Sequence, residues 1–378
     1  MPPALPHAFD VAVATSAAEL KALRPEWLAL EEKAVAPLPF QSFGQISTWL
    51  RHQPESLRLR VVVVRENGRA ALILPLALRS RIGLAVARMA GEPVAQYADV
   101  LLDPEIASED TFRAALGAAR AGGLDAIEFT RVRADSHLAR FAALLGTPEH
   151  LRVAPYADVG AFGSYDGFLQ TLSKNTRKSL RNRRNNLDRQ EGVAFAIIEG
   201  GAEARAALAA CMALKREWLQ SRGAISSAFR DPLTSEILLD LAEDHRNSGS
   251  VVLTMHVAGR LTAIYLGFEY RGTFFTYMSA YDPDFSDLSP GRMLLDHYLA
   301  TFPERNMRRL DLLPPDDGYK REWCSAAEEV ADYTLALSPA GRLYRDVYRN
   351  RVRPVMRQTW ARLPESVRGR IVARLLKV

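Results

Sequence analysis

A strongly basic stretch, residues 172–190, carries the residue types that most directly indicate chemistry. It holds seven Lys or Arg side chains and one acidic side chain in nineteen positions. On a helix with about 100° per residue, five of the cations fall within an arc of about 120°, opposite Leu172, Leu180 and Leu187. The five are Lys174, Arg177, Lys178, Arg181 and Arg184. The stripe lacks the Glu residues that pair with cations one turn away on an ordinary solvated helix. We therefore expect Lys174, Arg177, Lys178 and Arg181 to bind an anionic substrate, the alternative being a solvated face.

Several classes of anion could bind such a stripe. A phosphate-bearing substrate, an anionic polymer, nucleic acid and acidic lipid all match its charge. Nucleic acid is the least favoured class, because the stretch has no aromatic side chain between its charges on which a base could stack.

A second basic segment lies at the C-terminal end of the sequence. Residues 342–378 hold eleven Arg or Lys against two acidic side chains. Apolar residues recur among these arginines: Leu343, Val347, Val355, Trp360, Leu363, Val367, Ile371 and Leu375. We predict a basic amphipathic tail over residues 339–378 that either lies on an anionic membrane surface or packs against the protein.

The composition excludes several classes of protein. With 48% hydrophobic and 25% charged residues, the 378-residue chain is expected to be globular, with two domains. No apolar run reaches the roughly 18 residues of a membrane span, and the first residues lack a signal-peptide pattern. We therefore expect a cytoplasmic protein, held at the inner face of the membrane if the tail binds lipid. Two cysteines and seven scattered histidines lack the spacing of a disulfide framework or a metal site, so no metal is expected.

Hydrophobic periodicity indicates the same order of elements in each half of the chain. The first half has predicted helices at 19–33, 46–50 and 111–121 and strands at 57–65, 69–78, 84–89, 100–102 and 125–130. The second has helices at 165–190, 202–222, 232–247 and 291–302 and strands at 193–198, 250–257, 260–268, 273–281, 308–312 and 330–337. This order predicts an α+β (α/β) fold, in which helices flank a mixed, mostly antiparallel sheet in each half. The predicted domains are residues 1–155 and 156–338, followed by the tail 339–378.

Short motifs of the second half follow the basic stretch in a fixed order. They are Tyr281-Asp282-Pro283, Leu288-Ser289-Pro290-Gly291, Leu310-Asp311-Leu312 and Gly318-Tyr319-Lys320-Arg321-Glu322-Trp323. With residues 168–178, this set resembles the acetyltransferase-like family that includes cellulose-biosynthesis acetyltransferases, relatives of the Fem-type peptidyltransferases in the GNAT superfamily. The first half is similar to the family's N-terminal region in Pro39-Phe40-Gln41-Ser42, Leu74-Pro75-Leu76 and Tyr97-Ala98-Asp99. The resemblance implies two GNAT-like domains in tandem, the first degenerate, and transfer of an acyl group from a thioester such as acetyl-CoA.

The resemblance also implies where the acyl donor binds. In a GNAT site the donor pyrophosphate lies on backbone N–H groups at the start of a helix that follows the central strand. Here strand 273–281 leads to Ser289, with Pro290 suited to a first helical turn and Gly291 permitting close approach. We expect Ser289, Gly291 and Arg292 to bind acyl-CoA, together with Tyr319 and Lys320. The superfamily's usual signature, Arg or Gln followed by x-x-Gly-x-Gly or Ala, is missing from this loop.

Direct acyl transfer needs a proton acceptor for the nucleophile and a proton donor for the leaving thiolate. The sequence shows no recognisable Ser-His-Asp or Cys-His arrangement, so we expect no covalent acyl-enzyme. We predict Asp311 as the general base, Glu269 as the second candidate, and Tyr281 as the proton donor.

The acceptor is indicated only by the resemblance. Relatives act on exopolysaccharide sugars or lipid-linked cell-wall precursors, which implies N- or O-acetyl transfer to an anionic sugar or lipid-linked acceptor of the cell envelope. Three alternatives remain: N-acylation of a long-chain amine in lipid synthesis, aminoacyl transfer from charged tRNA, and a non-catalytic protein that binds an anionic ligand.

Overall fold

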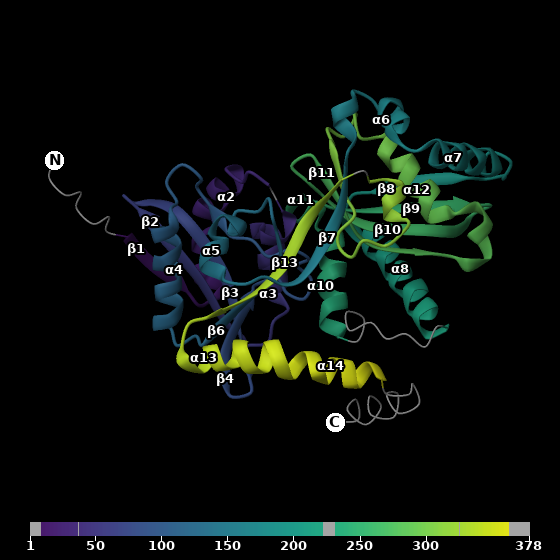
Figure 1. Cartoon of the computed structure of the whole chain (residues 1–378). Coiled ribbons are helices and arrows are strands. Elements are labelled where there is room, and N and C mark those ends of the chain that lie inside the picture. Colours follow the sequence, from purple (N-terminus) through teal and green to yellow (C-terminus); the bar gives the residue numbers. More distant parts are fainter. Residues whose placement is uncertain (1–8, 37, 222–230, 325, 363–378) are drawn as a thin grey trace.

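One mixed sheet runs through the whole molecule and is flanked by helices (Figure 1). The computed structural model describes residues 9–36, 38–221, 231–324 and 326–362. The strand order is β1-β2-β3-β4-β6-β13-β7-β12-β11-β10-β9-β8, with β5 paired to β3. The predicted α+β class, with a mixed sheet flanked by helices, is confirmed.

In residues 9–36 and 38–148, the first half forms six strands and the helices that cover them. Its strands are β1 (Phe9–Ala14), β2 (Arg58–Glu66), β3 (Arg69–Arg81), β4 (Leu84–Met89), β5 (Leu101–Leu102) and β6 (Ala126–Arg133). Its helices are α1 (Ala17–Ala22), α2 (Arg24–Glu32), α3 (Phe43–Arg51), α4 (Glu109–Ala121) and α5 (Ala142–Leu145), with short 3-10 turns η1 (Pro39–Gln41) and η2 (Leu138–Phe141).

The second half repeats this scheme with more elements. Its strands are β7 (Glu149–Asp158), β8 (Ala194–Ile198), β9 (Ser250–Val257), β10 (Arg260–Tyr270), β11 (Thr273–Tyr281), β12 (Arg309–Asp311) and β13 (Ala326–Ala336). Its helices are α6 (Tyr165–Thr171), α7 (Lys174–Leu187), α8 (Gly201–Ser221), α10 (Pro232–Glu243), α11 (His245–Ser248) and α12 (Pro290–Ala300). The 3-10 turns are η3 (Val159–Phe162), η4 (Pro283–Leu288) and η5 (Lys320–Glu322).

Tight turns place the meander strands in register. Asn67 and Gly68 between β2 and β3 both have positive φ, 52° and 78°, and Ala258 and Gly259 between β9 and β10 have 49° and 77°. Two consecutive positive φ angles give the turn whose twist matches a two-residue hairpin. Both dipeptides therefore form two-residue hairpin turns.

Each half contains the same parallel strand pair. β4 and β6 are parallel and are connected through α4, as β11 and β12 are parallel and connected through α12. Every other pairing in the sheet is antiparallel. The structural repeat expected from the order of elements is therefore present.

The sheet does not break at the predicted domain boundary near residue 155. β7 pairs with both β12 and β13, and β13 pairs on its other edge with β6 of the first half. The predicted boundary places β13 in the second half. Its pairing with β6 could not be predicted, because the residues around a strand do not indicate a partner that is distant in the sequence. Packing also crosses the boundary: the Phe40 ring lies 6.1 Å from the rings of both Phe268 and Phe275.

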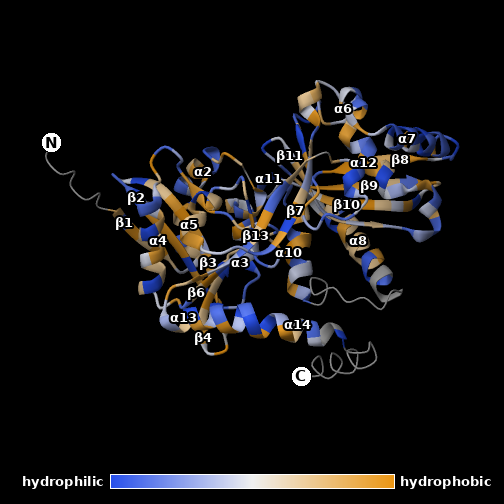
Figure 2. Ribbon diagram, in the orientation of Figure 1, coloured by the Kyte–Doolittle hydropathy of each residue, from blue (hydrophilic) through white to orange (hydrophobic). Residues whose placement is uncertain are grey.

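Two strands, β1 and β7, were not predicted, and one predicted helix is divided. The expected helix 165–190 is interrupted between α6 and α7, where Leu172 is extended and the Ser173 hydroxyl accepts a hydrogen bond from the Thr176 N–H at 3.0 Å. Such a serine is a strong helix start. α7 buries Leu180 and Leu187, and its remaining surface is hydrophilic (Figure 2).

The described part of the tail packs partly against the first half. It comprises α13 (Pro339–Leu343), the π-helical segment η6 (Tyr344–Val352) and α14 (Arg353–Arg362). Tyr344 is buried and donates a hydrogen bond to Glu128 at 2.6 Å, and Arg349 is buried beside Glu128 and Glu149. Leu343, Val347 and Val355 are exposed. The predicted apolar positions Leu363, Val367, Ile371 and Leu375, and the side chain of Trp360, lie outside the described residues. No helix within the described ranges is long and apolar enough to cross a membrane.

Candidate active site

The sheet opens between β11 and β12. The two strands pair over only three residues, from Thr273 opposite Arg309 to Phe275 opposite Asp311. β11 then continues through residues 276–281 with no partner on that edge in the described part of the chain. A register shift against β10 makes Tyr277 an extra residue here, which is a β-bulge. Its hydroxyl donates to the Val94 carbonyl of the first half at 3.0 Å. The free edge exposes backbone groups with which an extended ligand can pair.

Two adjoining pockets lie at this opening. The α12 pocket, about 490 Å³, is formed by β11, the loop after it, the start of α12 and residues 317–323. The interdomain pocket, about 280 Å³, is lined by β11, α10, residues 312–314 and Gln96 of the first half. Lys215, Tyr265, Ser279 and Tyr319 line both pockets. We call these four side chains the shared wall.

The first turn of α12 presents a backbone donor to its pocket. Ser289 is left-handed, with φ 51° and ψ 54°, and Pro290 occupies the first turn. The N–H groups of Arg292 and Met293 both bond to the Ser289 carbonyl, at 2.9 and 3.1 Å, and within the described residues the Gly291 N–H has no acceptor. A Cβ atom at Gly291 would project towards the Tyr265 ring, 3.8 Å away. The turn therefore keeps an open, polar approach to a helix N-terminus.

Two guanidinium groups give the α12 pocket its positive charge. Arg292 pairs with Glu322 and lies 5.9 Å from the Trp323 ring centre. Burial lowers the pKa of Arg292, and the positive charge of Arg183 lowers it further. Arg183, from α7, donates to the Ser179 hydroxyl at 3.1 Å and has no acidic partner in the described chain. Arg183 and Arg292 are neighbouring cations with one acidic partner, Glu322, between them. This excess of positive charge favours binding of an anion.

The shared wall holds the groups that can exchange protons. Lys215 is half-buried, and its Nζ donates to the Ser279 carbonyl at 3.2 Å. Burial lowers the pKa of Lys215, while nearby Cys211 and Asp317 raise it. Burial raises the pKa of Tyr319, as do Asp317 and Cys324. Tyr319 therefore stays protonated at neutral pH, whereas Lys215 loses its proton more readily than an exposed lysine.

Most of the predicted donor-site residues meet in the α12 pocket. Ser289, Gly291, Arg292 and Tyr319 all line it, together with Tyr281, whose side chain is exposed. Lys320 lies elsewhere: it is buried, lines the interdomain pocket, and its Nζ donates to the carbonyls of Leu313 and Pro315 at 2.8 and 2.7 Å. Lys320 thereby fixes the loop that follows β12.

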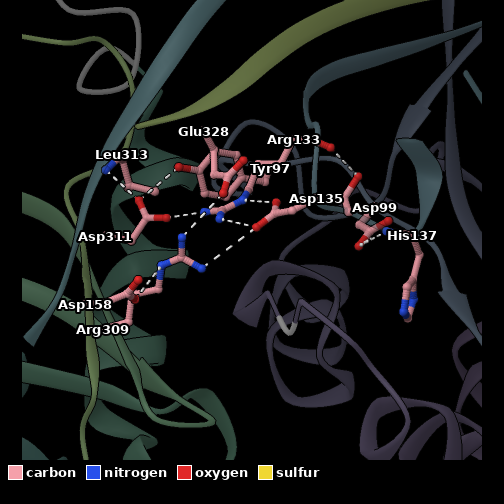
Figure 3. Close-up of polar contacts among 11 residues, drawn as sticks. Tyr97, Asp99, Arg133, Asp135, His137, Asp158, Arg309, Asp311, Leu313 and Glu328 are labelled. Atoms are coloured by element: carbon pink, nitrogen blue, oxygen red, sulfur yellow. Dashed lines mark hydrogen bonds and ion pairs between the residues drawn. The ribbon is translucent and has the colours of Figure 1, made fainter. Parts of the chain in front are cut away.

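Asp311 and Glu269 lie outside both pockets. Asp311 is fully buried, accepts hydrogen bonds from the Tyr97 hydroxyl at 3.0 Å and the Leu313 N–H at 2.8 Å, and pairs with Arg133 (Figure 3). Glu269 accepts from Tyr298 and from Arg305 and faces Phe274, at the end of β11 remote from Tyr281. Their predicted catalytic roles remain predictions, and every oxygen of the Asp311 carboxylate already has a partner.

The four predicted cations of the basic helix have different surroundings, and their role in binding remains a prediction. Arg177 donates to the carbonyls of Gln170 and Leu172, at 2.8 and 2.6 Å, and so closes the break before α7. Lys174 and Arg181 are exposed, and Lys178 lines a shallow groove beside the α12 pocket. Arg184, on the same predicted stripe, pairs with Asp296 of α12.

Sequence reasoning missed several residues that line the pockets, among them Arg183, Lys215 and Tyr265. Arg183 contributes to the positive charge of the basic stretch that drew attention to this helix. It lies outside the predicted stripe, and for that reason it was not selected. Lys215 and Tyr265 come from an ordinary amphipathic helix and a buried strand, and nothing in their local sequence distinguishes them. Within the described residues, no three His, Cys, Asp or Glu side chains gather as a metal site requires.

Comparison with known proteins identifies the fold. Residues 174–321 match the family model described as an acetyltransferase (GNAT) domain. No curated protein matches the chain in sequence. Among solved structures, FemX is similar over 89% of this chain and 99% of its own, with 12% identity and a TM-score of 0.60. A tandem GNAT protein from the clavulanic acid biosynthesis pathway matches over 88% and 99%, with 14% identity and a TM-score of 0.52.

A third structure, the C-terminal domain (DUF2156) of a putative lysylphosphatidylglycerol synthetase from Agrobacterium fabrum, covers 88% of this chain and 96% of its own, with 14% identity and a TM-score of 0.53. At these identities the likeness establishes a shared fold. The chain therefore has a tandem GNAT-like fold, and residues 174–321 of its second half are similar to an acetyltransferase (GNAT) domain. The narrower resemblance to cellulose-biosynthesis acetyltransferases remains a prediction.

Proposed function

We propose that this protein is an acyltransferase that moves an acyl group directly from a CoA thioester to an amine or hydroxyl of a cell-envelope precursor. One observation carries the proposal: two pockets meet where β11 and β12 separate, and they share Lys215, Tyr265, Ser279 and Tyr319. A donor and an acceptor that enter from the two pockets would meet at this wall, as a direct transfer requires.

The α12 pocket has the chemistry expected of a donor site. The Gly291 N–H and the helix dipole favour a diphosphate, and Arg183 and Arg292 supply the countercharge. The amide groups of a pantetheine arm could then pair with the free edge of β11 over residues 276–281, as an added strand does. The thioester would arrive at Ser279 and the shared wall.

The interdomain pocket is the proposed acceptor site. Gln96 and Ser235 provide polar groups there, and Leu238, Met278 and Leu313 provide apolar contact. The sequence motifs that resemble envelope-modifying acetyltransferases support a sugar or lipid-linked acceptor. Nothing in the lining selects nitrogen over oxygen as the nucleophile.

The chemistry assigns a role to two wall residues. The acceptor nucleophile attacks the thioester carbonyl carbon and forms the new C–N or C–O bond, while its proton passes to the neutral amine of Lys215. The tetrahedral intermediate then collapses with cleavage of the C–S bond, and the Tyr319 hydroxyl protonates the leaving thiolate. The lowered pKa of Lys215 and the raised pKa of Tyr319 suit these roles. Tyr319 is better placed than Tyr281 for the second proton transfer, because Tyr319 reaches both pockets.

Asp311 is assigned a positioning role. It fixes the Leu313 N–H, and Leu313 lines the acceptor pocket and receives the Lys320 ammonium on its carbonyl. Removing the Asp311 carboxylate would therefore disturb the loop after β12 before it disturbed a proton transfer.

Binding of acetyl-CoA, measured by calorimetry and thermal shift, tests the proposal. We expect saturable binding that Arg292→Gln weakens about tenfold or more, since a charge-assisted phosphate contact contributes roughly 1.5–3 kcal/mol. Arg321→Gln is the matched control, because Arg321 is exposed, lies outside both pockets and pairs with Asp316. Release of the CoA thiol with candidate acceptors then follows turnover. If neither acetyl-CoA nor a long-chain acyl-CoA binds, the proposed function is wrong.

A further inference from the structure

A shallow groove of about 400 Å³ continues from the α12 pocket along α7. Asn175, Lys178, Asn182 and Asn186 line it at spacings of three or four residues, so that they share one face of the helix. Arg183 lines both the groove and the α12 pocket, which makes the two continuous. Asp287, in η4 before α12, also lines the groove.

The two cations of the groove, Lys178 and Arg183, differ from two other cations of the basic helix because they have no acidic or carbonyl partner in the described chain. Arg177 is held by two backbone carbonyls, and Arg184 by Asp296. Lys178, by contrast, has neither an ion pair nor a hydrogen bond with any described residue, and Arg183 bonds only the Ser179 hydroxyl. The groove thus offers two unpaired positive charges and three side-chain amides against one exposed carboxylate.

We propose that this groove binds the 3′-phosphorylated adenosine end of the CoA donor, an inference that rests on the proposed function. A diphosphate at the start of α12 would lie against Arg183 and Arg292, and the nucleoside joined to it would continue into the groove. Lys178 stands about 7.5 Å from Arg183 along the helix axis, at about 1.5 Å per residue, so the two cations meet two separate phosphate groups. The asparagine amides supply donors and acceptors for the edge of a heteroaromatic base.

The proposal specifies the donor class. A free CoA thioester carries adenosine and the 3′-phosphate, whereas a thioester on a carrier protein carries only the phosphopantetheine arm. The groove would therefore favour free acyl-CoA over an acylated carrier protein, and acetyl-CoA over its 3′-dephospho form.

Calorimetric titration of the full chain with acetyl-CoA and 3′-dephospho-acetyl-CoA tests this inference. We expect the wild-type protein to bind acetyl-CoA about tenfold more tightly, the size of one charge-assisted contact. Lys178→Gln should remove most of this preference while leaving 3′-dephospho-acetyl-CoA binding unchanged. Arg181→Gln is the matched control on the same helix, because Arg181 is exposed and does not line the groove, and it should keep the preference.

Two outcomes overturn the inference, and they are distinguishable. If both donors bind the wild type equally, or if Lys178→Gln keeps the full preference, the groove does not bind the 3′-phosphate, although binding that depends on Arg292 would still support the proposed function. If neither donor binds at all, the proposed function fails together with this inference.

Discussion

Replacement of Asp311 by asparagine separates a structural carboxylate from a catalytic one. Asp311 is fully buried and pairs with Arg133, which also holds Asp135 through two hydrogen bonds of 2.8 Å (Figure 3). Removing one member of a buried ion pair costs about 3–5 kcal/mol. The asparagine side chain would keep an acceptor oxygen for Tyr97 and Leu313, and Arg133 would keep Asp135. We therefore expect a loss near the lower limit, about 3 kcal/mol of the free energy of unfolding.

Urea unfolding measures this loss. With a denaturant slope of about 3 kcal/mol per molar, the midpoint of Asp311→Asn should fall by about 1 M. Asp135→Asn is the matched control at the same arginine: its side chain is 27% exposed, so we expect a loss of only about 1 kcal/mol. Acetyl-CoA should bind Asp311→Asn with nearly the wild-type affinity, because Asp311 lines neither pocket.

The opposite pattern would refute this reasoning. A variant Asp311→Asn that unfolds at the wild-type urea concentration and binds the donor normally, yet releases no CoA thiol, would place Asp311 in the chemistry. That result would support the general base predicted from the sequence and would remove the positioning role proposed for this carboxylate.

Three further predictions concern the wall, the junction and the tail. If Lys215 accepts the proton, kcat/KM should rise with pH until the lowered pKa of Lys215 is passed, and Lys215→Gln should abolish that limb; an unchanged pH profile would exclude the role. Gly44→Ala should destabilise the protein, because the added Cβ would lie 1.9 Å from a backbone oxygen of α11. Gly117→Ala, with open space around it, should instead stabilise α4 by up to about 1 kcal/mol. Equal thermal midpoints for the two variants would contradict this prediction. Leu343 is 64% exposed on the arginine-rich tail, so Leu343→Glu should weaken flotation with vesicles containing anionic phosphatidylglycerol, and the exposed control Gln358→Glu should do so less; equal flotation of wild type and both variants would argue against a membrane contact at Leu343.

The elements that depend on local sequence were the ones that could be predicted. β9 and β11 have the predicted limits, and the positive φ angles of Asn67 and Gly68 follow from a two-residue turn between apolar strands. The start of α12 was also predictable, because Pro290 and Gly291 suit a first helical turn. Each of these features is determined within about ten residues of chain.

Features that depend on distant contacts could not be predicted. The pairing of β13 with β6 joins segments about two hundred residues apart, and the sequence of β13 does not indicate which strand it pairs with. Asp311 was predicted as the base, and its contacts with Tyr97 and Arg133 of the first half could not be read from the residues around it. Lys215 reaches the wall only because α8 packs across β11. In each case tertiary packing decides the surroundings of a residue with an ordinary local sequence.

The position of β13 also constrains how this chain folds. During synthesis the first half emerges long before residues 326–336, so β6 keeps an unpaired edge until nearly the whole chain is available. Unpaired edges bind other strands readily, and contacts of long sequence separation form slowly. A fragment ending at residue 155 should therefore associate through β6, and a cleaved chain should recover solubility when a peptide of residues 326–336 is supplied. The two halves are thus joined through one strand, β13, that the first half lacks until late in synthesis.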